Sequence, residues 1–333
     1  MQEEGAVGFL YHHFPVSNVD TWLFLPPLVA FVVSFFTSMG GVSGAFLLLP
    51  FQVSYLKFTT PSVSATNFVF NIVAIPSGVY RYVKEGRMAW PLTWVVIAGT
   101  LPGVFIGYYL RVLYLPEPRA FKAFVGCVLL YIGVRLLYEM LPRSQQGRQE
   151  TKALDEKFDA HAKRLKEERT ARIAAGLPSE AVIRTVSFSL VRVEYDFWGQ
   201  RFSFSTPGMF ILAFFVGIIG GTYGIGGGAI IAPFCVAVFR LPVYTVAGAA
   251  LMGTFLTSIA GVFFYSLVPL KAGLPTAPDW QLGLLFGAGG LLGMYCGARM
   301  QKFVPQRFIK FTLALLILFL AVRYVTPYLT FLY

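Results

Sequence analysis

Residues Gly220–Gly228 read Gly-Gly-Thr-Tyr-Gly-Ile-Gly-Gly-Gly and interrupt a long apolar segment at residues 207–239. A second glycine-rich break, Gly40–Gly44, reads Gly-Gly-Val-Ser-Gly and interrupts another apolar segment at residues 22–58. One crossing of a lipid bilayer needs about 20 apolar residues, and two crossings need about 40. Both segments have an intermediate length, and glycine weakens a helix in its interior. We therefore expect each segment to contain two shorter helices joined at the break.

The composition of the 333-residue chain is typical of a membrane protein. Hydrophobic residues make up 56% of the chain, charged residues make up 13%, and the mean hydropathy is +0.66. An average soluble domain has about 25% charged residues. Six further apolar segments each have the length of one membrane helix: residues 61–80, 91–112, 120–141, 242–268, 280–298 and 308–326. We expect an all-α integral membrane protein, which excludes a disordered chain, a disulfide scaffold and an ordinary cytosolic enzyme.

The net charge of +11 does not indicate a nucleic-acid-binding protein, because of where the charges lie. Most basic residues outside residues 142–206 stand at the ends of apolar segments, where they set membrane topology. Residues 142–206 are highly charged and are expected to form a cytoplasmic linker, with a solvated helix at 150–175 and a β-hairpin within 186–205. This linker separates a first membrane repeat, residues 1–141, from a second, residues 207–333.

The cysteines and the first residues fit the same class of protein. Cys127, Cys235 and Cys296 lie in apolar segments without Cys-x-x-Cys spacing, and we expect them to be small buried apolar residues. Residues Met1–Gly5 lack the basic region of a cleavable signal peptide. We therefore expect the first apolar segment to remain in the protein as a membrane anchor.

The two halves of the sequence repeat the same order of motifs. The aligned positions are Gly41, Gly44 and Pro50 with Gly224, Gly227 and Pro233; Asn71 with Thr254; Gly99, Gly103 and Gly107 with Gly289, Gly293 and Gly297; and Arg119 and Lys122 with Arg307 and Lys310. The order is kept while the loop lengths differ, which indicates a duplication. The Gly-x-x-x-Gly steps place small residues on one helix face, where they allow two helix backbones to approach closely.

The orientation of the two repeats depends on how each long segment lies in the membrane. A single crossing gives four crossings per repeat and a parallel pair, whereas a re-entrant hairpin gives three crossings and an inverted pair. Lys and Arg are enriched on the cytoplasmic side of membrane proteins. With hairpins and a cytoplasmic linker, Arg81, Lys84, Arg87, Arg240, Arg299, Lys302, Arg307 and Lys310 fall inside, and only Lys57, Arg111, Arg119, Lys122, Lys271 and Arg323 fall outside. We therefore expect two inverted repeats, each a glycine-broken re-entrant hairpin plus three transmembrane helices.

The two breaks are the candidate substrate-binding site. A broken helix leaves backbone groups that lipid cannot satisfy, so they are buried in protein or line a wet cavity. The N-terminus of a half-helix suits an anion, and in secondary transporters such breaks meet near the midplane. The candidate substrate-binding residues are those of the breaks and the polar residues that follow them: Gly41, Ser43, Gly44, Ala45, Asn67, Asn71, Gly224, Gly226, Gly227, Gly228 and Thr254.

Simpler roles stay open for several of these residues. Glycines in membrane helices often serve packing alone, and an Asn within a membrane must find a hydrogen-bond partner in any case. For Thr257 and Ser258 we expect hydrogen bonds within their own helix. We expect no catalytic residue, metal or cofactor, because the sequence shows no cluster of His, Cys and carboxylate residues. No carboxylate stands well inside an apolar segment, so an acidic proton relay is not expected either.

These motifs resemble the TauE/SafE family of sulfite and organosulfonate exporters. Residues Gly221–Pro233 resemble the family's Gly-x-Gly-Gly-Gly-x-x-x-x-Pro element, and Val246–Gly248 with Thr254 resemble its next segment. The first half departs from this pattern, since Ser43 and Ala45 stand where the family usually has glycine. This departure puts a symmetric site of two glycine breaks in question.

The resemblance implies a secondary transporter at the bacterial inner membrane that exports a small anion, either sulfite or a related sulfur oxyanion or organosulfonate. The anion would bind between the two breaks and be exposed to each side by alternating access. The implied partners are the lipid bilayer, a coupling ion such as a proton, and a second copy of the chain, with no nucleic acid. The alternatives are a channel-like anion pathway, a membrane enzyme acting on a sulfur compound, and a membrane scaffold or sensor that works through the linker.

Overall fold

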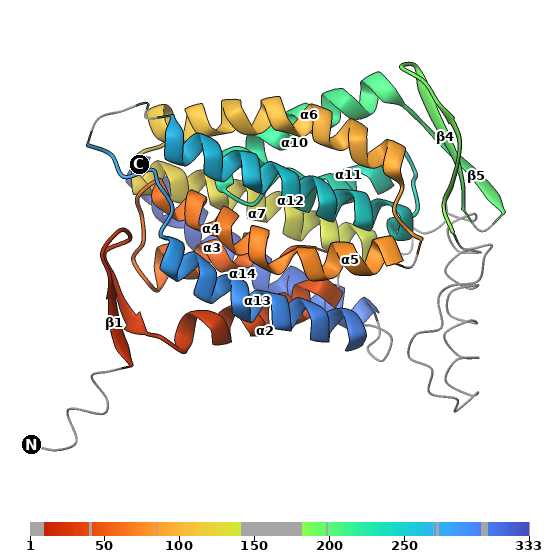
Figure 1. Cartoon of the computed structure of the whole chain (residues 1–333). Helices are drawn as coiled ribbons and strands as arrows, with labels where there is room; N and C mark the ends of the chain where they lie inside the picture. The colour runs from red at the N-terminus through yellow and green to blue at the C-terminus, as the bar shows by residue number, and fades with distance from the viewer. Residues whose placement is uncertain are drawn as a thin grey trace, which may run out of the picture.

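The apolar segments of the sequence form the helices of the protein. A computed structural model describes residues 10–39, 42–84, 86–140, 182–197, 199–268, 270, 273–300 and 306–332. The helices of the first half are α2 (Leu25–Met39), α3 (Ala45–Ser54), α4 (Ser62–Ala74), α5 (Pro76–Lys84), α6 (Trp90–Tyr109), the π-helix η1 (Leu110–Tyr114) and α7 (Pro118–Met140). Those of the second half are α10 (Thr206–Tyr223), α11 (Gly228–Val238), α12 (Val243–Leu267), α13 (Trp280–Met300) and α14 (Gln306–Leu332). Figure 1 shows them side by side in one bundle.

Two small antiparallel sheets lie at opposite ends of this bundle (Figure 1). β1 (Tyr11–Phe14) and β2 (Val19–Trp22) form a hairpin, and we call their end of the molecule the hairpin end. β3 (Arg184–Phe188), β4 (Arg192–Phe197) and β5 (Gln200–Ser205) form a sheet in the order β3-β4-β5, and we call their end the sheet end. A hairpin was expected within residues 186–205, and the structure has β4 and β5 there with β3 added at one edge. The helix expected at residues 150–175 lies outside the described residues.

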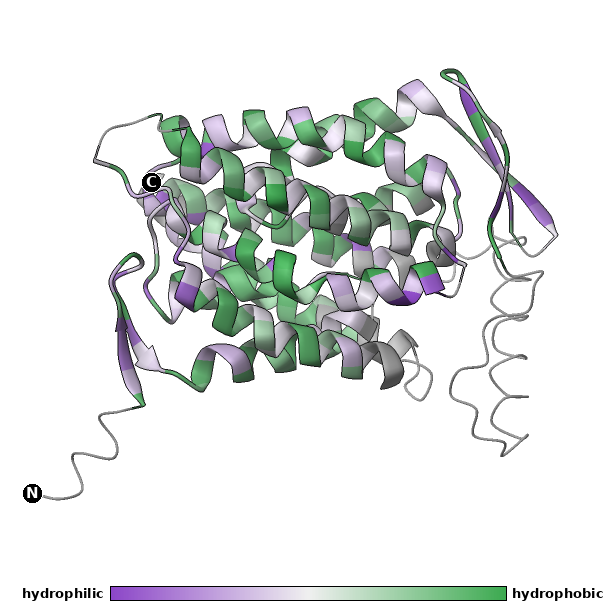
Figure 2. Cartoon of the chain, viewed as in Figure 1, coloured by the Kyte–Doolittle hydropathy of each residue, from purple (hydrophilic) through white to green (hydrophobic). Residues whose placement is uncertain are grey.

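The helices have the length and composition of membrane spans. Among the described residues, four stretches are long and apolar enough to cross a bilayer: Ser62–Lys84, Trp90–Tyr114, Thr206–Tyr223 and Thr245–Leu267. Shorter apolar helices cover Leu25–Ser38, Ala45–Ser54 and Ala314–Pro327. Figure 2 shows hydrophobic residues along the length of the helices and hydrophilic residues gathered at the two sheets and the loops. The protein is therefore a multi-pass, all-α membrane protein, as its composition predicted.

Glycines fix the closest helix contacts. A β-carbon on Gly99, Gly103 or Gly107 of α6 would come within 3.0 Å of backbone carbonyl oxygens of α10. These oxygens belong to Phe210, Phe214 and Ile218. Gly289, Gly293 and Gly297 of α13 meet the carbonyl oxygens of Pro27, Phe31 and Phe35 of α2 in the same way. A larger side chain at these glycines would push the helix pairs apart, so the Gly-x-x-x-Gly steps pack helices, as expected.

The ends of the two broken segments are fixed by contacts at opposite ends of the bundle. Phe239, directly after α11, packs against Phe204, just before α10, with ring centroids 6.5 Å apart. In the first half α2 follows the β1–β2 hairpin, and the loop after α3 leads to Ser62, whose hydroxyl donates to the Ala277 carbonyl. The 275–279 loop is tied to the hairpin because the Ser17 hydroxyl and amide both donate to Asp279 Oδ2. Thus the start of α10 and the end of α11 lie at the sheet end, whereas the start of α2 and the end of α3 lie at the hairpin end.

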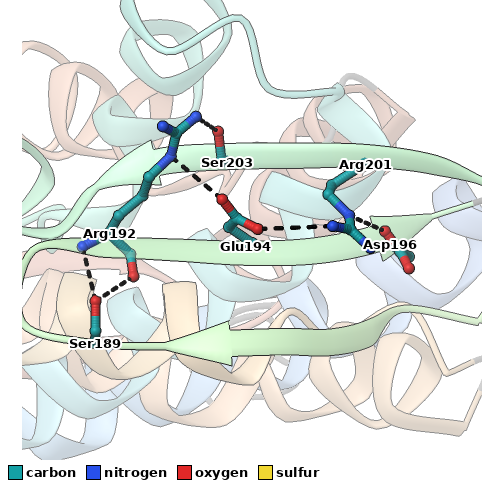
Figure 3. Close-up of polar contacts among 6 residues, drawn as sticks. All are labelled: Ser189, Arg192, Glu194, Asp196, Arg201 and Ser203. Atoms are coloured by element: carbon teal, nitrogen blue, oxygen red, sulfur yellow. Dashed lines mark hydrogen bonds and ion pairs between the residues drawn. The ribbon is translucent and has the colours of Figure 1, made fainter.

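The β3–β5 sheet has one apolar and one charged face. Tyr195, Phe197, Phe202 and Phe204 are buried, and the Tyr195 hydroxyl lies 2.8 Å from Thr245 Oγ1 at the start of α12. Burial raises the pKa of Tyr195. Figure 3 shows the other face, where Arg192, Arg201, Glu194 and Asp196 form ion pairs with N–O distances of 3.4–4.0 Å. The sheet therefore docks on the bundle through aromatic side chains and presents its charges to solvent.

The expectation that all three cysteines are buried is wrong. Only Cys235 is buried, with its sulfur 3.6 Å from the Met209 sulfur, whereas Cys127 is exposed and Cys296 is intermediate. Cys127 lies on the outer surface of α7, where a membrane bundle contacts lipid. A thiol is apolar enough for that surface, so hydropathy alone does not distinguish the two positions.

Candidate functional site

The first break, between α2 and α3, is closed by side-chain hydrogen bonds. Ser43 is fully buried, and its hydroxyl donates to Asn71 Oδ1 on α4 at 2.8 Å. The same hydroxyl oxygen accepts from the Ala45 amide at 3.3 Å, which caps the start of α3. Gly44 faces α2, because a β-carbon there would lie 3.0 Å from Ser34 Oγ and 3.3 Å from Thr37 Oγ1. Gly41, the remaining predicted residue of this break, lies outside the described residues.

Helix α4 joins the first break to the second. Asn67 Nδ2 donates to the carbonyl of Ala45 at 3.1 Å and to the carbonyl of Gly224 at 2.8 Å. Asn71 Nδ2 donates to the carbonyl of Ile225 at 3.1 Å. Both asparagines are fully buried. The carbonyls of Gly224 and Ile225, which lie in the second break, are therefore satisfied by two side-chain amides one helical turn apart, and Asn67 also bonds the carbonyl of the first residue of α3.

The second break, between α10 and α11, has no polar side chain of its own and depends on glycine for its backbone path. Gly224 has φ +84° and Gly226 has φ +74°, a backbone conformation that strains residues with a side chain. A β-carbon on Gly228 would lie within 3.0 Å of the Ala250 carbonyl oxygen and of Thr254 Oγ1 on α12. One on Gly227 would lie 2.6 Å from the Thr100 methyl group on α6. The start of α11 thus packs directly against the backbone of α12 and against α6.

The backbone amides at the start of α11 are available as donors. Within the part of the chain that the structure describes, the N–H groups of Gly226, Gly227 and Gly228 donate no hydrogen bond. All three residues are buried. Free amides at a helix N-terminus carry partial positive charge and bind anions. This is the feature of the second break that can hold a ligand.

The hydroxyl groups of the neighbouring helices are mostly used within their own helices. Thr254 Oγ1 donates to the Ala250 carbonyl at 2.9 Å, and Thr257 Oγ1 donates to the Gly253 carbonyl at 2.7 Å. Thr254 nevertheless stands beside Gly226 and Gly228, as described above. Ser258 Oγ is buried and has no partner among the described residues, so it does not follow the helix-internal bonding expected for it.

Several polar residues at the site were not predicted. Gln52 Nε2 donates to Asn67 Oδ1 at 3.3 Å, and the Tyr223 hydroxyl donates to the Phe46 carbonyl at 2.7 Å. The Tyr265 hydroxyl donates to the Gly221 carbonyl at 3.2 Å. Gln52 follows Ala45 by two helical turns, so a polar residue on the same face of an apolar helix was the available signal. Tyr223 adjoins Gly224 directly, but nothing in the sequence connects it to α3.

The site is neutral. All side chains named at the two breaks are uncharged, and the described residues contain no group of three His, Cys, Asp or Glu that could hold a metal ion. Positive potential at the breaks therefore comes from backbone amides and helix ends rather than from a side-chain charge.

The fold and the site together define a multi-pass helical membrane protein in which two helix breaks meet in the interior. The sequence pattern of the family described as Sulfite exporter TauE/SafE matches residues 27–324, and this chain belongs to that family. The match covers both breaks and nearly the whole bundle. The chain is a membrane transporter and not an enzyme, as the sequence predicted.

Two curated relatives carry transporter names. The chain is 22% identical over 275 residues to the probable membrane transporter protein YunE of Bacillus subtilis (strain 168), with 79% of this chain and 84% of that protein covered. It is 26% identical over 104 residues to the probable membrane transporter protein YdhB of the same organism, with 31% of this chain and 40% of that protein covered. No solved structure matches the chain.

Proposed function

We propose that the protein exports a small anion, sulfite or a related sulfur oxyanion or organosulfonate, which binds between the two helix breaks. The observation that carries the proposal is the set of buried, free amides at Gly226, Gly227 and Gly228, placed where α4 ties the second break to the first. Free amides of this kind hold oxyanions without a charged side chain. The description of the family supports sulfite as the first candidate substrate.

The predicted binding residues take different roles in this proposal. The amides of Gly226, Gly227 and Gly228 are the anion donors, and Gly44, Ala45 and Thr254 shape the walls. Asn67 holds the two breaks together, since both of its amide hydrogens are already donated to carbonyls. Asn71 keeps one amide hydrogen that it can donate to the anion. The Ser43 hydroxyl donates either to Asn71 Oδ1 or to the anion. Gly224, with φ +84°, shapes the backbone turn of the second break.

The two halves are proposed to be inverted repeats. Phe210, Phe214 and Ile218 align with Pro27, Phe31 and Phe35 when Gly224 is aligned with Gly41, and the two sets make equivalent contacts with α6 and α13. One broken segment has both of its termini at the sheet end, and the other has both at the hairpin end. This arrangement supports two re-entrant hairpins in opposite orientation. Each half then has three crossings, and the membrane repeats 1–141 and 207–333 flank a cytoplasmic linker at 142–206.

Alternating access is the proposed mechanism. The hydrogen bonds of Asn67 and Asn71 to carbonyls of the second break hold the two repeats together at this point. Rocking of one repeat against the other would lengthen these bonds on one side and open the site to that side. We place the protein in the bacterial inner membrane, with a homodimer as its assembly. Because the site is neutral, any coupled proton would be carried by the substrate's own titration.

The test is transport by purified protein in proteoliposomes. A sulfite gradient should give a saturable, protein-dependent current on a solid-supported membrane, with sulfate and thiosulfate as comparisons and several pH values to detect proton coupling. Gly227→Leu should abolish the signal because its β-carbon would come 2.6 Å from the Thr100 methyl group and displace the start of α11, whereas Gly208→Ala in the first turn of α10 meets only ordinary contacts and should transport normally. An electroneutral carrier gives no current, so isotope exchange is measured in parallel.

The outcomes separate the alternatives. Flux that does not saturate would indicate a channel-like pathway. Unchanged flux in a normally inserted Gly227→Leu protein would contradict the placement of the site. A flat result for all three anions in both assays would reject small sulfur oxyanions and favour a scaffold or sensor that works through the linker.

A further inference from the structure

A fully buried arginine lies near the hairpin end. Arg111 stands in the π-helix η1 and has no exposed surface. One terminal nitrogen of its guanidinium donates to the Leu115 carbonyl, and the other donates to the Thr59 carbonyl at 3.3 Å. The guanidinium also stacks on the Phe121 ring, 3.7 Å from its centroid. The side chain is therefore held in a fixed place inside the protein.

The charge of Arg111 is not neutralised by the described part of the chain. No carboxylate of the described residues lies within 4.0 Å of it, and its Nε has no hydrogen-bond partner there. The hydroxyl of Thr60, next to the Thr59 carbonyl that Arg111 contacts, is also buried without a partner. A buried, unpaired cation is costly in a membrane protein and is usually functional. Arg111 Nε and the hydroxyl of the residue next to Thr59 are thus two buried, unused donors, and an anion is the ligand that would pair with the charge.

The local backbone is also unusual at this point. The Leu115 amide donates to the Leu110 carbonyl at 3.0 Å, five residues earlier, which is the π-helical pattern. Such widened turns are rare and occur frequently at functional sites.

Arg111 lies between the hairpin end and the second break. It interacts electrostatically with Tyr265, whose hydroxyl donates to the Gly221 carbonyl just before the second break. Arg111 is therefore linked through Tyr265 to the residues just before the second break.

We propose that Arg111 Nε and the Thr60 hydroxyl form a second anion site, which takes a small oxyanion between the hairpin end and the breaks. This inference rests on the proposed function, because the anion meant is the transported one. The site supplies the full positive charge that the breaks lack. An anion held by Arg111 would be handed to the backbone amides when the repeats move.

The experiment uses the full chain in nanodiscs at constant ionic strength. Thermal unfolding is followed while sulfite, sulfate and thiosulfate are titrated, and flux is measured on the same variants in proteoliposomes. Arg111→Gln and Thr60→Val each remove a donor, and Arg111→Lys keeps the charge but loses Nε. Arg323→Gln is the matched control, since it removes a basic charge from an exposed position on α14.

The wild type should show an anion-dependent rise in unfolding temperature. Arg111→Gln should raise the apparent Kd by about tenfold or more, as expected when a charge-assisted hydrogen bond is lost. Thr60→Val, which is the safer variant for folding, should raise it a few-fold, and Arg323→Gln should leave it unchanged. Gly227→Leu should lose flux and still show the Arg111-dependent rise, because it displaces the start of α11 and leaves Arg111 and Thr60 in place.

The two proposals fail in different ways. Arg111→Gln and Thr60→Val with the wild-type binding curve would overturn the second site and make Arg111 a structural tie between Leu115 and Thr59. Absence of any anion-dependent rise in the wild type would also overturn it, whereas the proposed function is decided by the flux measurement alone. Equal losses in Arg111→Gln and Arg323→Gln would show general charge attraction instead of a site.

Discussion

The two helix breaks solve the same backbone problem by different chemistry. At the first break, Ser43 and Ala45 stand where the second break has Gly226 and Gly228, and the Ser43 hydroxyl bonds both Asn71 Oδ1 and the Ala45 amide. At the second break the corresponding residues are glycines. The positions on α12 that align with Asn67 and Asn71 carry Ala250 and Thr254. There the backbones approach closely and the amides stay free. The first break is closed by hydrogen bonds of its own serine, whereas the second break keeps backbone amides that can bind a ligand.

The largest effect is expected where the second break is given a side chain. Gly228→Ala would place a β-carbon within 3.0 Å of the Ala250 carbonyl and of Thr254 Oγ1, so we expect transport near background and a destabilisation of about 3 kcal/mol. The reciprocal change in the first break, Ala45→Gly, should cost about 1 kcal/mol. Initial flux per inserted protein and thermal unfolding measure both. Equal effects of the two changes would contradict the difference between the breaks.

Removing the amide that joins the breaks should have the next largest effect. Asn67→Ala leaves the carbonyls of Ala45 and Gly224 and the amide of Gln52 without their partner. We expect a loss of about 2–3 kcal/mol in stability and at least a tenfold fall in flux. Thermal unfolding and flux in proteoliposomes check this. Asn67→Asp keeps the shape but exchanges two donors for a charge, and wild-type behaviour of that variant would argue against the role of Asn67.

The serine of the first break should matter less. Ser43→Ala removes one hydrogen bond to Asn71 Oδ1 and the cap on the Ala45 amide, so we expect a loss of about 1–2 kcal/mol. Ser43→Gly restores the usual family residue and should change the preference among sulfite, sulfate and thiosulfate more than it changes stability. Competition between these anions in the flux assay is the measurement. Identical selectivity of both variants and the wild type would exclude Ser43 from the binding site.

The smallest effect is expected on α12. Thr257 uses its hydroxyl for the Gly253 carbonyl of its own helix. Thr257→Val keeps the shape, so we expect changes within about 0.5 kcal/mol in stability and within about twofold in flux. A strong loss of flux with normal thermal unfolding would instead place Thr257 in the anion pathway.

The sequence predicted the helices well because their signal is local. Long apolar segments, and glycine runs inside two of them, are enough to locate α2 with α3 and α10 with α11. The boundary between α4 and α5 was missed, although Pro76 follows Ile75 at that point, because hydropathy does not change across it. The β1–β2 hairpin was also missed, since its strands are only four residues long and half polar.

The sequence indicated which polar residues lie near the breaks better than it indicated which hydrogen bonds they make. Asn67 and Asn71 do stand beside the breaks, but Asn67 donates both of its amide hydrogens to carbonyls and Asn71 donates one. Sequence spacing cannot assign such partners, because Asn67 and Gly224 are 157 residues apart. Arg111 was counted only as a basic residue near a helix end, where arginine commonly reaches solvent.

The sequence by itself determined the class of protein, its membrane segments, the positions of the two breaks and its family. These follow from hydropathy, glycine content and motif order, which are properties of neighbouring residues. Only the tertiary structure decided which backbone groups are satisfied, which amides remain free and which arginine is buried. Hydrogen-bond partners and burial depend on segments that packing brings together from distant parts of the chain, and in this protein α4 makes that connection between the two breaks.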